Sequence, residues 1–415
     1  MKALVNRFIQ FLDDAPTSYH AVQATVVRLE KEGFTELFET TPWKIKKGHG
    51  YFVRRSGSIF AFKVPTQPIE RAITYAAHTD SPALKLKPQG EFLSDGQQLL
   101  HFEVYGAPIL ATWIGRELYL AGRIFCEDAK GKIVQDLVSF KESPIFIPNL
   151  AVHLDRQVNE TGLIVNKQDH LVALAAESET SYLKKLFGKR KVVHAELFAV
   201  PLHTPSFCGL SNEWLTSYRL DNLASVVSSL EAFLQVQSKD TLSMISFFNH
   251  EEIGSETYEG AQSGFFNDCF QRICFALKMD LEQQMCLKAR SCTLSSDVAH
   301  ACHPNHQDKH DVRHRVQLGK GIVIKTNAQE RYASPFDLTA SIIQAWKKHK
   351  IQYQFFSARN DIPSGMTIGS IHAAKSDVKT IDIGIPLLGM HAAREMIAVK
   401  DYVMAVDALR SVVLR

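Results

Sequence analysis

The sequence has few cysteines, and their arrangement argues against disulfide bonds. Only seven occur in 415 residues, an odd number, and no two form a CxxC pair. Free thiols in a reducing compartment are the simplest interpretation, so we expect a cytoplasmic protein without a disulfide scaffold.

Long apolar stretches are also missing. No run of 18 or more apolar residues occurs, so no transmembrane helix and no membrane partner is expected. The first 20 residues lack the apolar stretch and the small-residue cleavage site of a signal peptide. Their apolar positions instead have helical spacing and predict a first amphipathic helix: Leu4, Phe8, Ile9, Phe11 and Leu12.

An excess of charge of either sign is absent as well. The 47 basic and 44 acidic residues leave a net charge of +3, too small for this length to indicate nucleic-acid or membrane-surface binding. The basic stretch 184–191 is therefore interpreted as a solvated loop. With 45% hydrophobic residues the chain is of ordinary globular composition, and its length suggests two domains or one large domain with an insertion.

Several apolar, β-rich runs end abruptly in polar residues, a pattern typical of buried parallel strands. Helical patterns over 223–234 and 338–346 lie between them. This alternation predicts an α/β fold, a mixed and mostly parallel sheet sandwiched by helices, with ligands bound beyond the carboxyl ends of the strands. The expected strands are 73–77, 242–248, 273–277, 353–356 and 380–385.

Residues 91–212 have a different pattern, with short β-like runs, turn residues such as Pro144 and Pro148, and no alternation of strand and helix. We predict a β-rich domain of residues 91–212 inserted into an α/β domain formed by residues 1–90 and 213–415.

Histidines and acids gather at the predicted strand ends, and this set carries the functional hypothesis. Histidine and carboxylate ligands suit zinc, manganese or cobalt. The HExxH signature of zincins is missing, and a span of more than 300 residues excludes a zinc finger. The set is His78, Asp80, Asp221, Glu251, Glu252, Asp297 and His391.

Three local patterns within this set suggest roles. Adjacent residues leaving a strand point in different directions, so one of Glu251 and Glu252 can bind metal while the other acts as general base. A carboxylate two residues after His78, that of Asp80, can accept the second ring N–H of a metal-bound histidine. Asp221 opens a predicted helix, whose N-terminal N–H groups favour a carboxylate.

Taken one at a time, these residues have ordinary explanations. His78 with Asp80 can be a polar loop, the adjacent glutamates a solvated surface, and Asp221 an N-cap; Asp297 can be a turn residue and His391 a core histidine. The position of His78, the Glu251-Glu252 pair and His391 after apolar, strand-like runs favours the metal site. The segment 300–314 holds five of the 17 histidines but is a polar loop around Pro304 without regular ligand spacing, so a surface or subunit-contact role is favoured.

At these residues the chain resembles the aspartyl aminopeptidase family, cytosolic metallo-aminopeptidases that remove acidic N-terminal residues. The resemblance covers nearly the whole chain, and its motifs occur in the same order. They are residues 18–22, AAHTDSPALKLKP (76–88), NLAVHLDRQVNE (149–160), RLDNLASV (219–226), FNHEEIGSETYEGAQS (248–263), SSDVAHACHPNH (295–306), GIVIKTNAQERYA (321–333), RNDIPSGMTIGS (359–370) and DIGIPLLGMHAARE (382–395).

The resemblance implies a zinc-peptidase-like catalytic domain with two metal ions per chain, zinc before manganese or cobalt. Asp221 would bridge both ions, His78 and Asp297 would complete one site, and Glu252 and His391 the other. Glu251 would be the general base and Asp80 would orient His78. Lys325 and Tyr332 would bind the acidic side chain of the substrate, although alone they are an ordinary strand-end lysine and a packed tyrosine.

The resemblance also implies that the inserted domain serves as a lid and in assembly. Its His153 would approach the active site of a neighbouring subunit, and dimers would assemble into a tetrahedral dodecamer. Two departures from the family pattern remove no ligand: Ala392 stands where a serine is commoner, and Asn249-His250 stand where the family has an aspartate before the glutamates.

Three alternatives to an acid-specific aminopeptidase remain. An aminopeptidase of broader or neutral specificity, or a deacylase on the same fold, would keep the same ligands. A non-catalytic assembly protein would be expected to have lost some of them, and all five ligand positions and Glu251 are present.

Overall fold

The computed structural model describes residues 1–413, which form two compact units. The first comprises residues 1–80, 206–390 and the chain from 395 onward. The second comprises residues 81–205 and the short segment 391–394. The domain boundaries predicted at 91 and 212 stay a prediction, and the units are described separately below.

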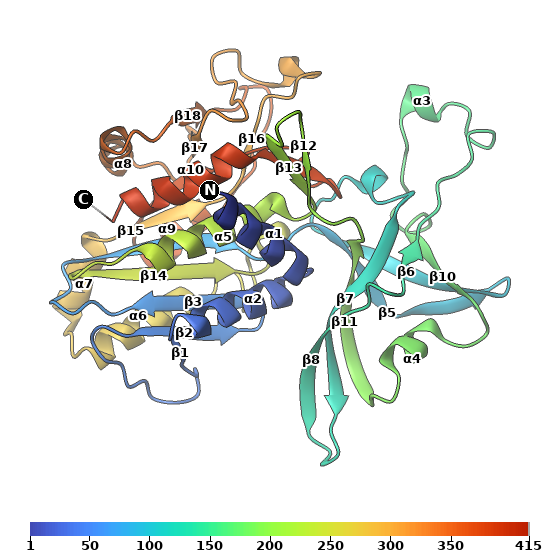
Figure 1. Ribbon diagram of the computed structural model, residues 1–415, viewed down its shortest axis with the longest axis horizontal. Helices are drawn as coiled ribbons and strands as arrows, with labels where there is room; N and C mark the ends of the chain where they lie inside the picture. The colour runs from blue at the N-terminus through green and yellow to red at the C-terminus, as the bar shows by residue number, and fades with distance from the viewer. Residues whose placement is uncertain (414–415) are drawn as a thin grey trace. The chain divides into compact units, whose positions relative to one another are not determined.

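The first unit is built on a nine-stranded sheet (Figure 1). Its four central strands β14, β4, β15 and β19 are parallel, and the strands outside them are mixed in direction. The predicted mixed, mostly parallel sheet is therefore confirmed. In spatial order the strands are β1 (Thr35–Glu36), β2 (Gly50–Arg55), β3 (Ser58–Lys63), β14 (Thr241–Phe248), β4 (Arg71–His78), β15 (Cys292–Ser296), β19 (Lys379–Gly384), β17 (Ile322–Lys325) and β18 (Tyr353–Phe356).

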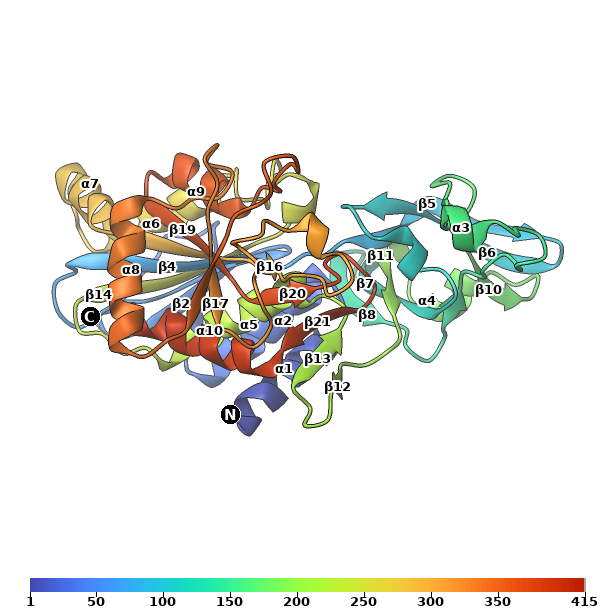
Figure 2. The ribbon, with the colours of Figure 1, turned by 90° about the horizontal axis from the view of Figure 1, so that it is seen from above.

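Helices cover both faces of this sheet (Figure 2). On β4, Ile73 and Tyr75 pack into the core below one set of helices, while Ala72 and Ala76 face the other set. This burial on both faces explains why the central strands are nearly continuous apolar runs. One set is α1 (Lys2–Asp14), α2 (Ser18–Lys31), α5 (Leu220–Gln235), α8 (Phe336–Lys348) and α10 (Val399–Ser411); the other is α6 (Phe265–Ala276), α7 (Leu281–Ala289) and α9 (Ile368–Ser376).

One predicted strand is wrong. Residues 273–277, expected to be a strand, lie at the end of helix α6 and in the turn after it. The buried positions of α6 recur with helical spacing, at Phe265, Cys269 and Ile273 and at Phe266, Phe270 and Cys274. A short apolar run read without its preceding residues does not distinguish a strand from a buried helix.

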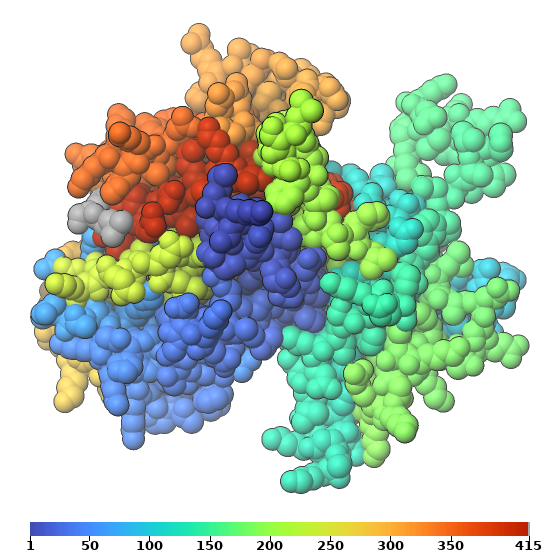
Figure 3. Space-filling model, viewed as in Figure 1, coloured from blue at the N-terminus to red at the C-terminus, as the bar shows by residue number. Residues whose placement is uncertain are grey.

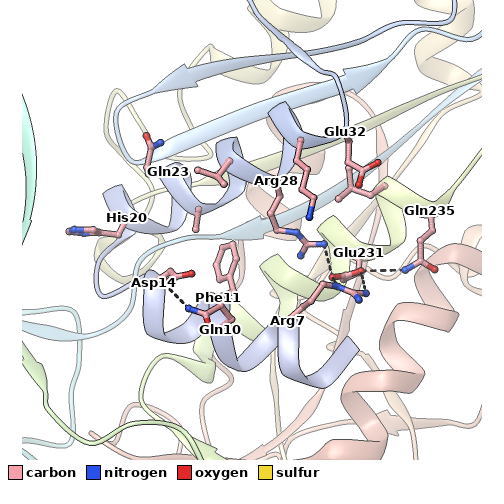
Figure 4. Close-up of a pocket in the computed structure, with 14 residues that line it drawn as sticks. Arg7, Gln10, Phe11, Asp14, His20, Gln23, Arg28, Glu32, Glu231 and Gln235 are labelled. Atoms are coloured by element: carbon pink, nitrogen blue, oxygen red, sulfur yellow. Dashed lines mark hydrogen bonds and ion pairs between the residues drawn. The ribbon is translucent and has the colours of Figure 1, made fainter. Parts of the chain in front are cut away.

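The helices α1, α2 and α5 are joined on one side of the first unit by an ion-pair triad around the buried carboxylate of Glu231 (Figure 4). The Glu231 carboxylate accepts two hydrogen bonds of 2.8 Å from Arg7 and one of 2.6 Å from Arg28. Burial opposes ionisation of Glu231, but the two guanidinium groups outweigh it and lower its pKa. The triad lies in a groove of about 830 Å³ between these helices, and Figure 3 shows the two N-terminal helices, in dark blue, at the surface.

The second unit is an antiparallel β-barrel, which confirms the predicted β-rich insertion. Every pairing in it is antiparallel, and β11 pairs with both β5 and β7, so that the sheet closes on itself. Its strands are β5 (Ala83–Ser94), β6 (Gln97–Tyr105), β7 (Glu117–Glu127), β8 (Ile133–Ser139), β9 (Ile145–Phe146), β10 (Val172–Glu177) and β11 (Val192–Pro201), and its short helices are α3 (Val158–Thr161) and α4 (Tyr182–Phe187). The lysines and arginine of the basic stretch 184–191 are exposed, on α4 and the loop after it.

A smaller five-stranded sheet completes the first unit. In order its strands are β12 (Ser206–Cys208), β13 (Trp214–Ser217), β21 (Glu395–Ala398), β20 (Pro386–Leu388) and β16 (Ala299–His300). Among the helices of residues 1–413, none combines the length and the apolar character needed to span a bilayer.

Candidate metal centre

The parallel strands of the first unit bring four of the predicted site residues together at the carboxyl ends of the strands. His78 is the last residue of β4, and Asp297 directly follows β15. Glu251 and Glu252 begin a 3-10 turn, Glu251–Ile253, just after β14. Because β14, β4 and β15 are adjacent and parallel, their carboxyl ends coincide, as the sequence pattern predicted.

Asp221 reaches the same edge from the start of α5. The backbone there is not regular helix: Arg219 has a left-handed conformation, Asp221 and Asn222 have non-helical dihedral angles, and the peptide bond between them is cis. The Asp221 N–H donates to a Glu395 carboxylate oxygen at 3.0 Å. The Asn222 side chain donates to the Ser296 carbonyl at 2.9 Å, next to Asp297. These bonds tie the start of α5 to β21 and to the end of β15.

The side chains of these residues converge around His78, whose ring is almost fully buried. Its Nε2 lies 3.4 Å from Asp221 Oδ1, 3.5 Å from Asp297 Oδ1 and 3.9 Å from Glu251 Oε2. Three groups of three residues could each hold a metal ion, because within each group one ligand atom from every residue lies within 4.8 Å of the other two. The groups are His78 with Asp221 and Asp297, Asp221 with Glu252 and His391, and His78 with Glu251 and Glu252. The first two groups have the same members as the two predicted ligand sets and share Asp221.

Asp80 links the two segments that carry these ligands. One of its carboxylate oxygens accepts the Glu251 N–H and the other accepts the Glu252 N–H, each at 3.1 Å. His78 Nδ1 lies 3.2 Å from the Asp80 carbonyl oxygen and 3.5 Å from its Oδ1. Asp80 therefore holds the histidine and the turn with the two glutamates in one arrangement, through its backbone as well as its side chain.

The protonation equilibria of the cluster reflect crowded negative charge. Burial raises the pKa of Glu251 to about 8, and Asp297, Asp80 and Asp221 add to the rise against the opposing effect of His78. Burial, Asp221 and Glu251 raise the pKa of Glu252 well above its ordinary value. Burial disfavours the charged form of His78, yet Glu251, Asp221, Asp297 and Asp80 raise its pKa well above 6.5.

This donor set fits a divalent metal. Five carboxylates, those of Asp80, Asp221, Glu251, Glu252 and Asp297, converge with His78 in a space where only Lys325 adds a permanent positive charge among the described contacts of the cluster. A bound cation would favour the carboxylate forms and reverse the rise in the pKa values of Glu251 and Glu252. Imidazole with carboxylate oxygens is a donor combination that zinc, manganese and cobalt accept.

Lys325 and Tyr332 lie beside the cluster. Lys325 is the last residue of β17, is 3% exposed, and its Nζ lies 3.0 Å from Asp297 Oδ2. Burial opposes its charge, but Asp297, Tyr332 and Asp382 raise its pKa. Its ammonium group lies 5.5 Å from the centre of the buried Tyr332 ring. In the structure the lysine thus contacts a candidate ligand carboxylate.

Other histidines singled out in the sequence are not members of the three groups. His153 is exposed in the second unit and belongs to none of the groups found in residues 1–413. No histidine of the segment 300–314 belongs to them either. There His303 Nδ1 accepts the Asn305 N–H and His310 Nε2 accepts the His303 N–H, so these rings hold the backbone of their own loop.

Three buried polar residues around the site were not predicted from the sequence. Glu395 and Asn222 make the contacts at Asp221 described above, and Glu259 accepts hydrogen bonds from Gly57 and Asn249 beside the glutamate turn. All three occur within the motifs quoted above, but no local spacing marks them as different from surface residues.

An α/β sheet with candidate histidine and carboxylate ligands converging at its strand ends is the arrangement expected of a metal-dependent hydrolase. The sequence pattern of the family described as "Aminopeptidase I zinc metalloprotease (M18)" matches residues 11–412. The chain is 34% identical over 416 residues to a Streptomyces avermitilis protein named "Probable M18 family aminopeptidase 2", covering 97% of this chain and 95% of that protein. It is 33% identical over 448 residues to a "Probable aspartyl aminopeptidase" of Ricinus communis, covering 95% and 91%.

Solved structures agree with these relatives. A chain of the structure described as "Cryo-EM structure of the Ape4 and Nbr1 complex" has a TM-score of 0.93 at 32% identity, covering 99% of this chain and 85% of that chain. The mApe1 dodecamer of S. cerevisiae has a TM-score of 0.84 at 24% identity, covering 98% and 95%, and supports the fold. The chain belongs to the M18 family of zinc metallo-aminopeptidases and is a hydrolase acting on peptides.

Proposed function

We propose that this aminopeptidase prefers peptides with an acidic N-terminal residue and uses two metal ions per chain, most readily zinc, with manganese or cobalt as substitutes. The observation that carries the two-metal proposal is the sharing of Asp221 between two groups of ligand atoms. His78 and Asp297 would complete one site, and Glu252 and His391 the other.

Glu251 is the proposed general base. It lies beside both ligand groups, 3.9 Å from His78, but is not needed to complete either of them. When bound, zinc lowers the pKa of a coordinated water toward neutrality and polarises the scissile carbonyl. The Glu251 carboxylate would accept the proton of the attacking water and deliver it to the leaving amine. Asp80 would keep Glu251 in place through its backbone N–H.

The acidic preference is proposed from Lys325 and Tyr332. Lys325 brings a buried positive charge to within 3.0 Å of a candidate ligand, and a charge at this depth acts on a substrate carboxylate with little screening. The Ricinus communis relative, named an aspartyl aminopeptidase, supports the proposal. A competing specificity for neutral residues is suggested by the pairing of Lys325 with Asp297, which already engages the ammonium group.

Assembly is proposed from the family. The S. cerevisiae relative is a dodecamer by its title, and we propose dimers that form a tetrahedral dodecamer here, with the barrel of the second unit in contacts and as a lid. His153, exposed on that unit, would then donate to the substrate carbonyl bound by a neighbouring subunit. A cytoplasmic location remains the expectation from the free cysteines.

The test is metal analysis of the purified protein together with hydrolysis of substrates that differ only in an N-terminal Asp, Glu or Leu. We expect close to two equivalents of zinc per chain, loss of turnover on chelation with recovery on adding zinc, and at least ~10-fold higher kcat/KM for Asp than for Leu. Activity that survives complete metal removal would contradict the metal site. Equal rates on Asp and Leu would leave an aminopeptidase of broader specificity, and turnover of acylated amino acids alone would indicate a deacylase.

A further inference from the structure

The turn that carries Glu251 and Glu252 is closed at its two ends by one side-chain pair. Asn249, the first residue after β14, donates through Nδ2 to Glu259 Oε2 at 2.8 Å. Both residues are largely buried, with Asn249 1% and Glu259 9% exposed. The same Oε2 accepts the Gly57 N–H at 2.8 Å. Ten residues apart in the chain, the pair brings the beginning and the end of this loop together.

Neighbouring groups reinforce the closure. The Ser58 hydroxyl donates to the Glu259 carbonyl at 2.7 Å and accepts the Asn249 N–H at 2.8 Å, so one serine of β3 contacts both ends of the loop. Within the loop, the Thr257 hydroxyl oxygen accepts N–H groups from Glu259 and Gly260. The middle of the loop is held from outside by Asp80, as described above. Closure of the two ends and the contacts of Asp80 with the middle of the loop therefore fix the two glutamates.

The side chains of Asn249 and Glu259 are also tightly packed against the backbone of Gly57. A Cβ atom on Gly57 would lie 2.3 Å from Asn249 Nδ2 and 3.0 Å from Glu259 Oε2. The backbone of residue 57 thus touches both side chains, and only glycine allows this approach. Neither side chain can rotate far without losing its hydrogen bond or meeting the β2–β3 turn.

The charge of the Glu259 carboxylate restricts which residue can occupy position 249. Among the described residues, the Glu259 carboxylate accepts hydrogen bonds from two neutral donors, the Gly57 N–H and the Asn249 amide. An aspartate at 249 would replace the second donor by another carboxylate at hydrogen-bonding distance in a buried place, where like charges repel strongly. Position 249 is also one of the two places where the sequence departs from the motif that it otherwise resembles.

We infer that Asn249 and Glu259 are a matched positioning pair, which sets the position of Glu251 and Glu252 and requires an amide at 249 while 259 is a carboxylate. The inference rests on the roles proposed for those two glutamates. Neither member of the pair touches the ligand atoms; both act through the loop that they close.

The experiment is a double-mutant cycle of N249D, E259Q and N249D/E259Q in the full chain. Measured quantities are the melting temperature without metal, zinc affinity by competition with a chelator, and kcat and KM separately. E259Q alone should change little, because a glutamine carbonyl can accept both hydrogen bonds. N249D should weaken zinc affinity and lower kcat at least ~10-fold with KM nearly unchanged, as substitutions of groups supporting metal ligands do. In the E259Q background the same change should cost less than ~3-fold, since the repulsion is gone.

Equal costs of N249D in the two backgrounds would overturn the matching. A lower melting temperature with unchanged zinc affinity and kcat would overturn the positioning role, because the pair would then be merely structural. If N249D does not fold, recovery of folded protein in the double variant supports the inference and failure of both contradicts it. Melting temperature and zinc affinity need no substrate, so these readings stand even if the proposed specificity or the role of Glu251 fails.

Discussion

Two groups of buried charged side chains in the first unit differ in how their charges are balanced. In the triad of Arg7, Glu231 and Arg28, one carboxylate is matched by two guanidinium groups, which lower its pKa although burial opposes them. In the strand-end cluster, carboxylates outnumber cations, and the pKa values of Glu251 and Glu252 are raised.

The difference separates a structural charge group from a functional one. A buried charge that is paired within the chain is compatible with stability, whereas a buried excess of one sign costs free energy unless an ion from solution compensates it. The triad is complete with the chain's own groups, and we propose that a metal completes the cluster. Perturbed pKa values alone would mark both groups, because the pKa of Asp297 in the cluster is lowered like that of Glu231; the balance of charge within each group is the informative quantity.

The largest effect is expected from removing the ligand that the two metal sites share. Asp221→Asn should lose most bound zinc and reduce kcat/KM at least ~1000-fold, because a metal contributes several kcal/mol to catalysis. Metal content and kinetics are measured side by side, with Glu231→Gln as the control from the triad. If Asp221→Asn kept two zinc ions, or if Glu231→Gln lost them, the comparison between the two groups would fail.

The next largest effect concerns Glu251, which the proposal treats as a base and not as a ligand. Glu251→Gln should retain two metals per chain and turn over at least ~100-fold more slowly, the usual size of general-base effects. Zinc analysis together with single-turnover kinetics checks both halves of the statement. Near-normal turnover would be incompatible with the assignment.

A smaller effect is expected at the edge of the cluster. Lys325→Ala should reduce the ratio of kcat/KM for Asp over Leu substrates by at least ~10-fold, since the pocket loses its cation. Lys325→Arg, which keeps the charge, is the matched control, and zinc content is measured because Lys325 also contacts Asp297. A Lys325→Ala enzyme that keeps its zinc and still prefers Asp would remove this lysine from the pocket.

The smallest effect is one on stability alone. Glu231→Gln should lower the free energy of unfolding by about 2–3 kcal/mol at pH 7 and leave kcat/KM unchanged. This loss is smaller than that from breaking a fully buried ion pair, because Arg7 is 46% exposed. The folded-state pKa of Glu231 is lowered, so its contribution is present above the unfolded carboxyl pKa of about 4.3 and is lost as the pH falls through the folded value. Urea unfolding from pH 7 to pH 3 should show the two proteins converging; a constant gap would exclude this origin.

Much of the fold and of the candidate site could be predicted because the signals are local. Strands such as β4 and β14 end in a change from apolar to polar residues, and parallel strands bring such ends together, so His78 and the adjacent glutamates follow from that rule. The strand before Asp297, Cys292–Ser296, is not among the predicted strands. The wrongly predicted strand at 273–277 shows the limit of this rule, since a helix buried on one face can contain the same kind of short apolar run.

What could not be predicted depends on contacts between distant segments. The closure of the barrel through β11 pairs residues far apart in the chain. Glu395 and Glu259 read as surface acids until the fold buries them against Asp221 and Asn249. In the segment 300–314, the densest in histidine, His303 and His310 accept backbone N–H groups of their own loop, which no count of histidines reveals.

The insertion of the barrel between two ligand-bearing segments has a consequence for how the protein matures. His78 precedes the barrel and Asp221 follows it, so these two ligands meet only after 125 intervening residues of the second unit, 81–205, have been synthesised and their ends brought together. Tight binding of zinc would thus require that the parts of the first unit before and after the insertion have both been synthesised and have folded together. Because metal that binds only the folded chain stabilises it by mass action, zinc supply in the cell would set how many newly made chains remain folded.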